Sequence, residues 1–193
     1  MKNLFNSLIC LIFTINVSSQ ITTIVPLSSY NYPNGAYLRD LNNEFLPYVG
    51  TWKGVRDNKE YTFVFQIFTE HLFTYPNGEF HYEDVLKAKY EVKDLALDDV
   101  IFTTMSAVNF DDFWIDAIGT PDNTGRIDFL FTDVEHCYNA MTFALFTIPG
   151  NINQLKYGVF NYTDCCVTQD CVYIDVLSIP VPIPKKPVIF TKQ

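Results

Sequence analysis

Basic residues are scarce in this sequence, which holds 13 lysines and arginines against 22 aspartates and glutamates, for a formal net charge of −9 at pH 7. With so few cations the chain has no basic stripe that would displace counterions from phosphates, which argues against nucleic acid as a partner. The same shortage disfavours adhesion to an anionic lipid surface. We interpret the acidity mainly as a contribution to solubility.

Long apolar runs are also missing. After residue 19 no segment reaches the roughly 18 uninterrupted apolar residues of a membrane-spanning helix, so we predict no transmembrane segment. Residues 1–19 combine a basic start at Lys2, an apolar run over Leu8–Phe13 and small residues up to Ser19. This is the pattern of a cleavable secretory signal peptide. We therefore expect cleavage near Ser19/Gln20 and a secreted or periplasmic protein.

Catalytic motifs are absent from the sequence as well. No serine lies in a Gly-x-Ser-x-Gly turn, and no Asp-x-Asp-x-Asp-Gly loop is present to bind calcium. Of the histidines His71, His81 and His136, only His81 has a carboxylate, Glu83, at the i, i+2 spacing that shares one strand face. We favour the simpler interpretation that both are solvated residues at the mouth of a hairpin. The sequence predicts no catalytic site, no cofactor and no metal, and so not an enzyme.

The cysteines, by contrast, form a pattern. Cys10 falls in the predicted signal peptide, and four others remain: Cys137, Cys165, Cys166 and Cys171. An even number in an exported chain favours two disulfides. A bond between the adjacent Cys165 and Cys166 would be strained, so we expect one of them to pair with Cys171 and the other with Cys137. A metal site is the alternative, since His136 precedes Cys137, but no Cys-x-x-Cys pair supports it.

Alternation of apolar and polar residues dominates the chain after residue 49. Tyr61–Ile67 places its aromatic residues on one strand face, and Leu86–Val92 alternates apolar residues with lysine and glutamate. Asn77-Gly78 and Pro149-Gly150 are turn sequences, and Val188–Lys192 is a final short strand that closes the sheet. With about eight to ten strands, the chain is predicted to be all-β, as an antiparallel up-and-down barrel or a strongly coiled sandwich. The barrel has the advantage of leaving no exposed edges.

The predicted division of the chain is a signal peptide over residues 1–19, an extended N-terminal arm over residues 20–48, and a β-barrel domain over residues 49–193. In the arm, Leu38, Leu41 and Phe45 have helical spacing. They predict a short helical turn before the first strand, which Pro47 would end.

The barrel domain begins at Gly50-Thr51-Trp52-Lys53, where glycine permits a sharp turn and the indole supplies a large apolar plug for a barrel end. The stretch LNNEFLPYVGTWK (residues 41–53), together with VIFTKQ (residues 188–193), resembles an uncharacterised family of small exported bacterial lipocalin-like proteins, which carries only a domain-of-unknown-function label. The resemblance implies a lipocalin- or calycin-like barrel and no particular activity. Lipocalins pair this tryptophan with an arginine near the last strand, whereas the tail of this chain offers only Lys185, Lys186 and Lys192.

Aromatic residues are abundant, with 17 phenylalanines, 12 tyrosines and two tryptophans. In a barrel of eight strands, inward side chains either fill the interior or line a pocket for one small ligand, and so many large rings favour filling. If a pocket exists, we expect these residues to line it: Trp52, Tyr61, Phe63, Phe65, Tyr90, Phe129, Phe131 and Tyr157.

Two functions are compatible with this pattern. One is an exported barrel that binds a small apolar molecule in its interior. The alternative is an interaction or structural protein with a filled barrel, which binds an unidentified protein through exposed segments. The candidate segments are the arm at Ile21–Asp40, the cysteine loop, and the proline-rich stretch Pro180–Pro187.

Overall fold

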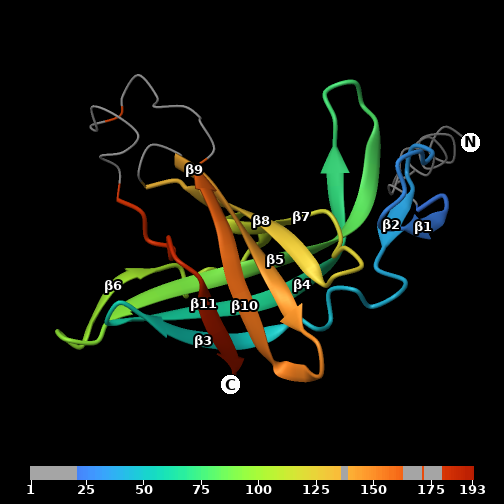
Figure 1. The fold of residues 1–193 in the computed structure, drawn as a ribbon. Helices are drawn as coiled ribbons and strands as arrows, with labels where there is room; N and C mark the ends of the chain where they lie inside the picture. The colour runs from blue at the N-terminus through green and yellow to red at the C-terminus, as the bar shows by residue number, and fades with distance from the viewer. Residues whose placement is uncertain (1–20, 136–138, 163–170, 172–179) are drawn as a thin grey trace, which may run out of the picture.

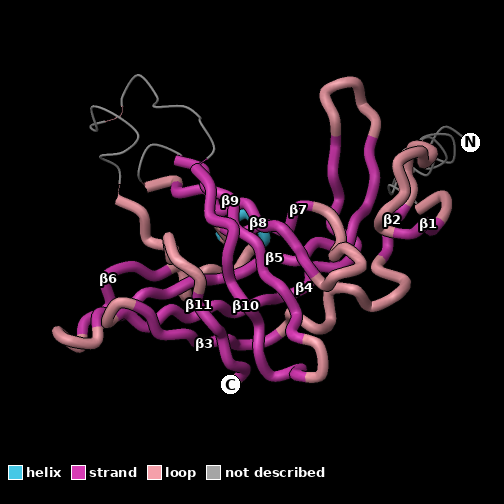
Figure 2. The backbone as a smooth tube through the Cα atoms, viewed as in Figure 1, coloured by secondary structure: helices cyan, strands magenta, loops and turns pink. Residues whose placement is uncertain are grey.

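The structure, a computed structural model, describes residues 21–135, 139–162, 171 and 180–193. Its elements are β1 (Ile24–Pro26), β2 (Tyr37–Arg39), β3 (Gly50–Arg56), β4 (Lys59–Thr74), β5 (Phe80–Asp94), β6 (Asp99–Thr103), the 3₁₀ turn η1 (Phe110–Asp112), β7 (Ile115–Ile118), β8 (Arg126–Asp133), β9 (Asn139–Ile148), β10 (Asn151–Tyr162) and β11 (Val188–Lys192). Within this part of the chain η1 is the single helical element, so the predicted all-β class is confirmed (Figure 2). No helix in these residues is long and apolar enough to cross a membrane.

Eight strands close into a barrel (Figure 1). Hydrogen-bonded neighbours follow the order β3, β4, β5, β7, β8, β9, β10 and β11, and β11 returns to pair with β3. Every neighbouring pair in this ring is antiparallel. The predicted up-and-down barrel is therefore confirmed, with Val188–Lys192 as its closing strand.

The contact between the first and last strands of the barrel depends on a glycine. Gly54 on β3 lies so close to β11 that an added Cβ would be 2.7 Å from Val188 Cγ1 and 2.9 Å from the carbonyl oxygen of Ile189. Real Cβ atoms do not approach backbone oxygens so closely. Gly54 thus sets how near the two strands come, and the barrel closes at this point.

The N-terminal segment holds two short strands. Its strand β2 pairs in parallel with β5, and β1 pairs in parallel with β2. The segment expected to hold a short helix forms a run of turns, in which the amide of Leu46 donates to Asn43 O and that of Tyr48 to Phe45 O. The Asp40 carboxylate accepts hydrogen bonds from the backbone amides that begin this run. The turns bury Phe45 and Tyr48 over the barrel end that holds Trp52.

Beyond this end, β4 and β5 continue as a long hairpin, which we call the hairpin arm (residues 69–83), and which projects from the barrel in Figure 1. A β-bulge begins it, where Glu70 adopts φ of 54°. The buried Asp84 carboxylate holds the bulge, since it accepts hydrogen bonds from the amides of Glu70 and Asp40 and, at 2.5 Å, from the Tyr37 hydroxyl. One side chain therefore joins the hairpin arm to the N-terminal arm.

Candidate functional site

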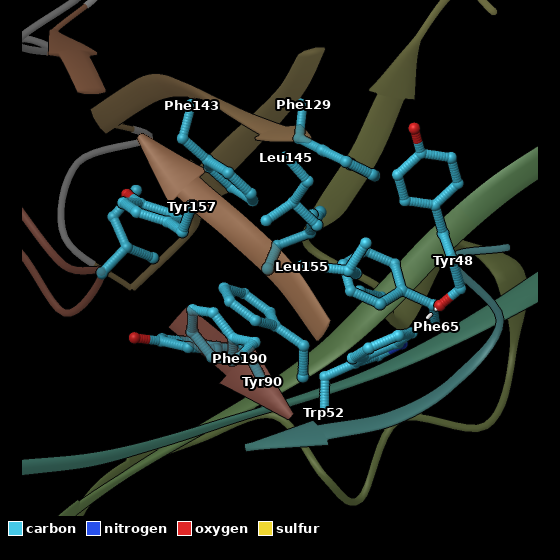
Figure 3. Close-up of a cluster of buried hydrophobic side chains, with 14 of the residues drawn as sticks. Tyr48, Trp52, Phe65, Tyr90, Phe129, Phe143, Leu145, Leu155, Tyr157 and Phe190 are labelled. Atoms are coloured by element: carbon cyan, nitrogen blue, oxygen red, sulfur yellow. Dashed lines mark hydrogen bonds between the residues drawn. The ribbon is translucent and has the colours of Figure 1, made fainter. Parts of the chain in front are cut away.

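Trp52 closes one end of the barrel. Its side chain is fully buried, and its indole Nε1 donates a 2.6 Å hydrogen bond to the carbonyl oxygen of Tyr48, as Figure 3 shows. Tyr48 in turn donates from its hydroxyl to Gly125 O at 2.8 Å. Because the indole has only one polar atom, this bond satisfies it completely inside an apolar core. The turn segment and the first strand are thereby fixed to each other.

A lysine lies over the indole. Lys192 on β11 is the direct cross-strand partner of Trp52 on β3, and its Nζ lies 5.2 Å from the centre of the Trp52 ring. Its side chain crosses Gly50, where an added Cβ would be 3.1 Å from Lys192 Cε. A cation at this distance from a ring face is attracted by the ring quadrupole. Lys192 therefore covers the face of the buried indole with a cation.

The interior of the barrel is filled by aromatic rings. Phe63 on β4 and Phe143 on β9 belong to strands that lie opposite each other in the ring, yet their ring centres are only 5.6 Å apart. Phe65 meets Phe129 at 5.1 Å, and Phe143 stacks on Tyr157 at 5.0 Å. In Figure 3 the labelled rings of Phe65, Phe129, Phe143 and Tyr157 lie in one cluster of buried side chains. Rings in contact across the axis leave no room for a ligand between them at this level.

All eight residues predicted to line a pocket point into this cluster, and each is at most 7% exposed. Seven of them are at most 2% exposed, and Tyr61 has the largest exposed fraction. Tyr61 also lines a surface cavity of about 350 Å³ with Ile183 and Lys186 at the other barrel end. The structure thus brings the predicted residues together, where they contact one another.

The proline-rich stretch covers that other end. Tyr90 donates a 2.9 Å hydrogen bond to Pro182 O, Tyr157 donates a 2.6 Å bond to Pro184 O, and Ile183 between them is 2% exposed. Burial raises the pKa of both phenols, so they remain protonated donors. Only Ile183 and Pro184 of this stretch are buried, whereas Pro180, Lys185, Lys186 and Pro187 are exposed as expected. Proline carbonyls can accept bonds from buried tyrosines, while the missing proline amides need no partner. That the stretch binds a partner stays a prediction.

His81 and Glu83 are in contact, as their spacing on one strand face allows, but the His81 side chain is buried. His81 Nε2 lies 3.1 Å from Glu83 Oε2, and His81 is only 4% exposed. The rings of Phe73, Tyr75 and Tyr32 lie 5.1, 5.6 and 5.3 Å from the imidazole centre. The interpretation of His81 as a solvated residue is therefore wrong, because the N-terminal arm brings Tyr32 over it. Among the residues described here, no three His, Cys, Asp or Glu side chains gather to hold a metal ion.

The second histidine of the hairpin arm, His71, stacks on Phe110 of η1, with ring centres 3.4 Å apart. The ammonium of Lys87 lies 3.9 Å from the same phenylalanine ring and pairs with Asp116 at 2.8 Å. Burial lowers the pKa of His71, and Lys87 lowers it further, against the opposing influence of Asp111. His71 is therefore neutral near pH 7.

The sequence reasoning did not assign a role to Tyr48, Phe143, Phe190 or Lys192. A signal was available for all four. Phe143 lies in Ala140–Ile148, which is almost wholly apolar and so indicates a central strand, and the other three lie in the segments 41–53 and 188–193. Three cysteines of the predicted disulfides, Cys137, Cys165 and Cys166, lie outside the described residues, and Cys171 is half-buried. The disulfides therefore stay a prediction.

The fold and this site define a closed eight-stranded β-barrel whose interior is filled by stacked rings. Comparison of the chain with protein-family models, curated proteins and solved structures finds no match.

Proposed function

We propose that this chain is an exported binding protein of the lipocalin-like kind, without catalytic activity, whose barrel is a solid scaffold for binding surfaces on its outside. The contact between Phe63 and Phe143 across the barrel axis is the observation that carries the proposal. Pockets for small molecules typically enclose about 300–1,000 Å³. An interior site of that size would require several buried rings to leave the core, and each emptied ring position costs about 3–5 kcal/mol.

The hairpin arm is the surface that we assign to a protein partner. It stands clear of the barrel, and it carries Leu72 and Tyr75 at 43% and 48% exposure. Tyr30, in the loop before β2, is 97% exposed. Tyrosines of this kind are enriched among the residues that dominate binding energy in protein interfaces. The base of the arm is anchored by the Asp84 hydrogen bonds, which reduces the conformational freedom that the base can lose on binding.

A pair of photo-crosslinking variants tests this assignment. A benzophenone side chain placed at Tyr75 should yield one defined crosslinked partner in the medium or compartment that receives the protein. The matched control replaces Leu97, which is 74% exposed in the turn between β5 and β6, and should yield none. Equal adducts at both positions, or none at either, would contradict the assignment.

Native mass spectrometry of the protein, purified without denaturant, tests the scaffold itself. The expected result is that any compound retained by the protein is retained equally by a variant whose interior is more tightly filled. A retained apolar compound, lost in a Phe143→Trp variant whose larger ring further fills the interior, would instead support an interior ligand site.

The same purified protein also tests whether the chain is exported and oxidised. The mature chain should begin near Gln20, and its cysteines should react with a maleimide only after reduction. Thiols that are free before reduction would rule out the proposed pair of disulfides.

A further inference from the structure

A groove lies outside the barrel at the tryptophan end, between the turns before β3 and the β9–β10 hairpin. We call it the end groove. Its volume is about 560 Å³, within the range of small-molecule sites. Its apolar lining residues are Leu46, Pro47, Ile148, Pro149, Ile152 and Leu155. The groove is separate from the ring-filled interior, and it is separate from the hairpin arm.

One wall of the end groove is a wide bulge in β10. Asn151 pairs with Ile148 and Leu155 pairs with Thr147, so the three residues between Asn151 and Leu155 face no partner on β9. Asn151 holds the bulge, because its Nδ2 donates to Gln154 Oε1 at 3.0 Å and its Oδ1 accepts from the amide of Asn153 at 3.1 Å. The bulge holds Ile152 in solvent at 87% exposure.

The opposite rim is Leu46, which is 60% exposed, and the floor is Leu155, which is 2% exposed and belongs to the barrel core. Two large apolar side chains therefore face water across a groove whose floor is already apolar. Exposed apolar residues gathered around a concavity indicate a binding site more often than single ones do.

The charge of the groove narrows the ligand class. Its lining contains neutral polar residues, one cation in Lys192, and no acidic residue, in a chain of formal net charge −9. No carboxylate of the described residues forms an ion pair with Lys192, whose side chain lies against Trp52 and Gly50. An apolar groove with one ammonium and no carboxylate is complementary to a molecule with one anionic group and an apolar chain.

We propose that the end groove binds a free long-chain carboxylate, that is, a fatty acid. Its carboxylate pairs with the Lys192 ammonium, and its chain lies between Leu46 and Ile152 over Leu155. This site goes beyond the proposed function and does not depend on it, because it uses neither the hairpin arm nor the barrel interior.

Calorimetric titration of the full mature protein with laurate, below its micelle concentration, tests the proposal. One laurate per chain is expected, and dodecyltrimethylammonium, which has the same chain with the opposite charge, should bind at least about tenfold more weakly. Lys192→Met keeps the aliphatic cover over Trp52 and should weaken laurate binding by about tenfold, the loss expected for one charge-assisted hydrogen bond. Lys192→Arg, which restores the charge, should retain the affinity.

Ile152→Ser tests the apolar wall without disturbing the core, and it should weaken laurate and the uncharged 1-dodecanol by a similar factor, about fivefold. Leu97→Ser is the matched control, a similarly exposed apolar residue away from the groove, and should change neither affinity. The proposal is overturned if laurate does not bind, or if Lys192→Met and Ile152→Ser leave its affinity unchanged. Two further results would overturn the proposal in protein that takes up no free laurate. One is that Lys192→Met and Ile152→Ser reduce sedimentation of the protein with phosphatidylglycerol vesicles, which would indicate a membrane surface as the ligand. The other is that they reduce self-association of the chain, which would indicate a second copy.

Discussion

At the scale of single residues, three side chains form one unit around the indole. Trp52 donates to Tyr48, Tyr48 donates to Gly125, and Lys192 covers the indole from β11. These contacts join the turns before β3, the first and last strands of the barrel and the start of β8. The Trp52 indole therefore does more than fill apolar space, because the hydrogen bond of its single polar atom fixes the orientation of the ring.

Replacement of Trp52 measures how much its hydrogen bond contributes to the free energy of unfolding. Trp52→Phe keeps an aromatic plug but removes the Nε1 donor, so the buried carbonyl of Tyr48 loses its partner. We expect a loss of about 1–3 kcal/mol in the free energy of unfolding, measured by urea denaturation. Val108→Ala, at a residue that is 75% exposed, is the control and should change it by less than about 0.5 kcal/mol. A change in Trp52→Phe no larger than this control would show that the hydrogen bond contributes nothing.

The partly buried His71 makes the free energy of unfolding depend on pH. Because burial lowers its pKa in the folded protein, the unfolded chain binds more protons as pH falls through the ordinary histidine range near 6.5. Stability should therefore decline from pH 7 toward pH 5, before most carboxylates titrate. In His71→Gln this part of the decline should be smaller, as followed by urea midpoints at both pH values. An identical pH dependence in the two proteins would exclude His71 as its source.

At the scale of elements, the shape of the barrel depends on irregularities in its strands, namely β-bulges, one interrupted strand and one glycine. Bulges in β4 and β10 turn the hairpin arm and the groove wall away from the barrel, and the excursion between β6 and β7 interrupts the strand that pairs with β5. Glycine at position 54 permits the closest approach of β3 to β11. Each irregularity lies either next to a surface with a proposed function or at the point where the sheet closes.

A methyl group at position 54 should separate the closing strands. Gly54→Ala would place its Cβ against Val188 and a backbone oxygen, and overpacking of this kind costs about 1–3 kcal/mol or more. Hydrogen exchange at the β11 amides should accelerate. Gly158→Ala on β10 is the matched control, because no atom lies within 4 Å of its added Cβ, and it should leave exchange unchanged. Slow exchange at β11 in Gly54→Ala would contradict the closure argument.

At the scale of the whole molecule, closure joins the two ends of the domain. β3 begins the barrel and β11 ends it, and they pair only after all the intervening strands are in place. Such non-local pairing makes folding slow and strongly cooperative. The rings of Phe63 and Phe190 are 4.9 Å apart, so the closing strand also completes the aromatic core.

Removal of the closing strand should abolish the cooperative transition. A chain that ends at Pro187 lacks Phe190 and Val188 and leaves β3 and β10 as open edges. Thermal unfolding followed by near-ultraviolet circular dichroism should show no sharp transition, whereas removal of Gln193 alone should preserve it. A native-like transition in the shorter chain would mean that the barrel is stable without closure.

Much of this architecture could be predicted from local patterns. Alternation in Tyr61–Ile67 and Leu86–Val92 determined which residues face the interior, and the turns at Asn77-Gly78 and Pro149-Gly150 determined where the hairpins fold. Both signals come from neighbours in the chain, since strand side chains alternate with period two and positive φ favours glycine. Tyr61, Phe63, Phe65 and Tyr90, the predicted inward residues of these two stretches, are therefore buried.

Only the tertiary structure decided whether those residues enclose space or fill it. The distance between Phe63 and Phe143 depends on the number of strands, their stagger and the closure of β3 on β11, which are non-local quantities. The position of Lys192 over Trp52 depends on the same register, and the end groove depends on a bulge that leaves no mark in the alternation of β10. Local sequence specifies the direction of a side chain along its own strand, but what it meets is decided by strands far away in the chain.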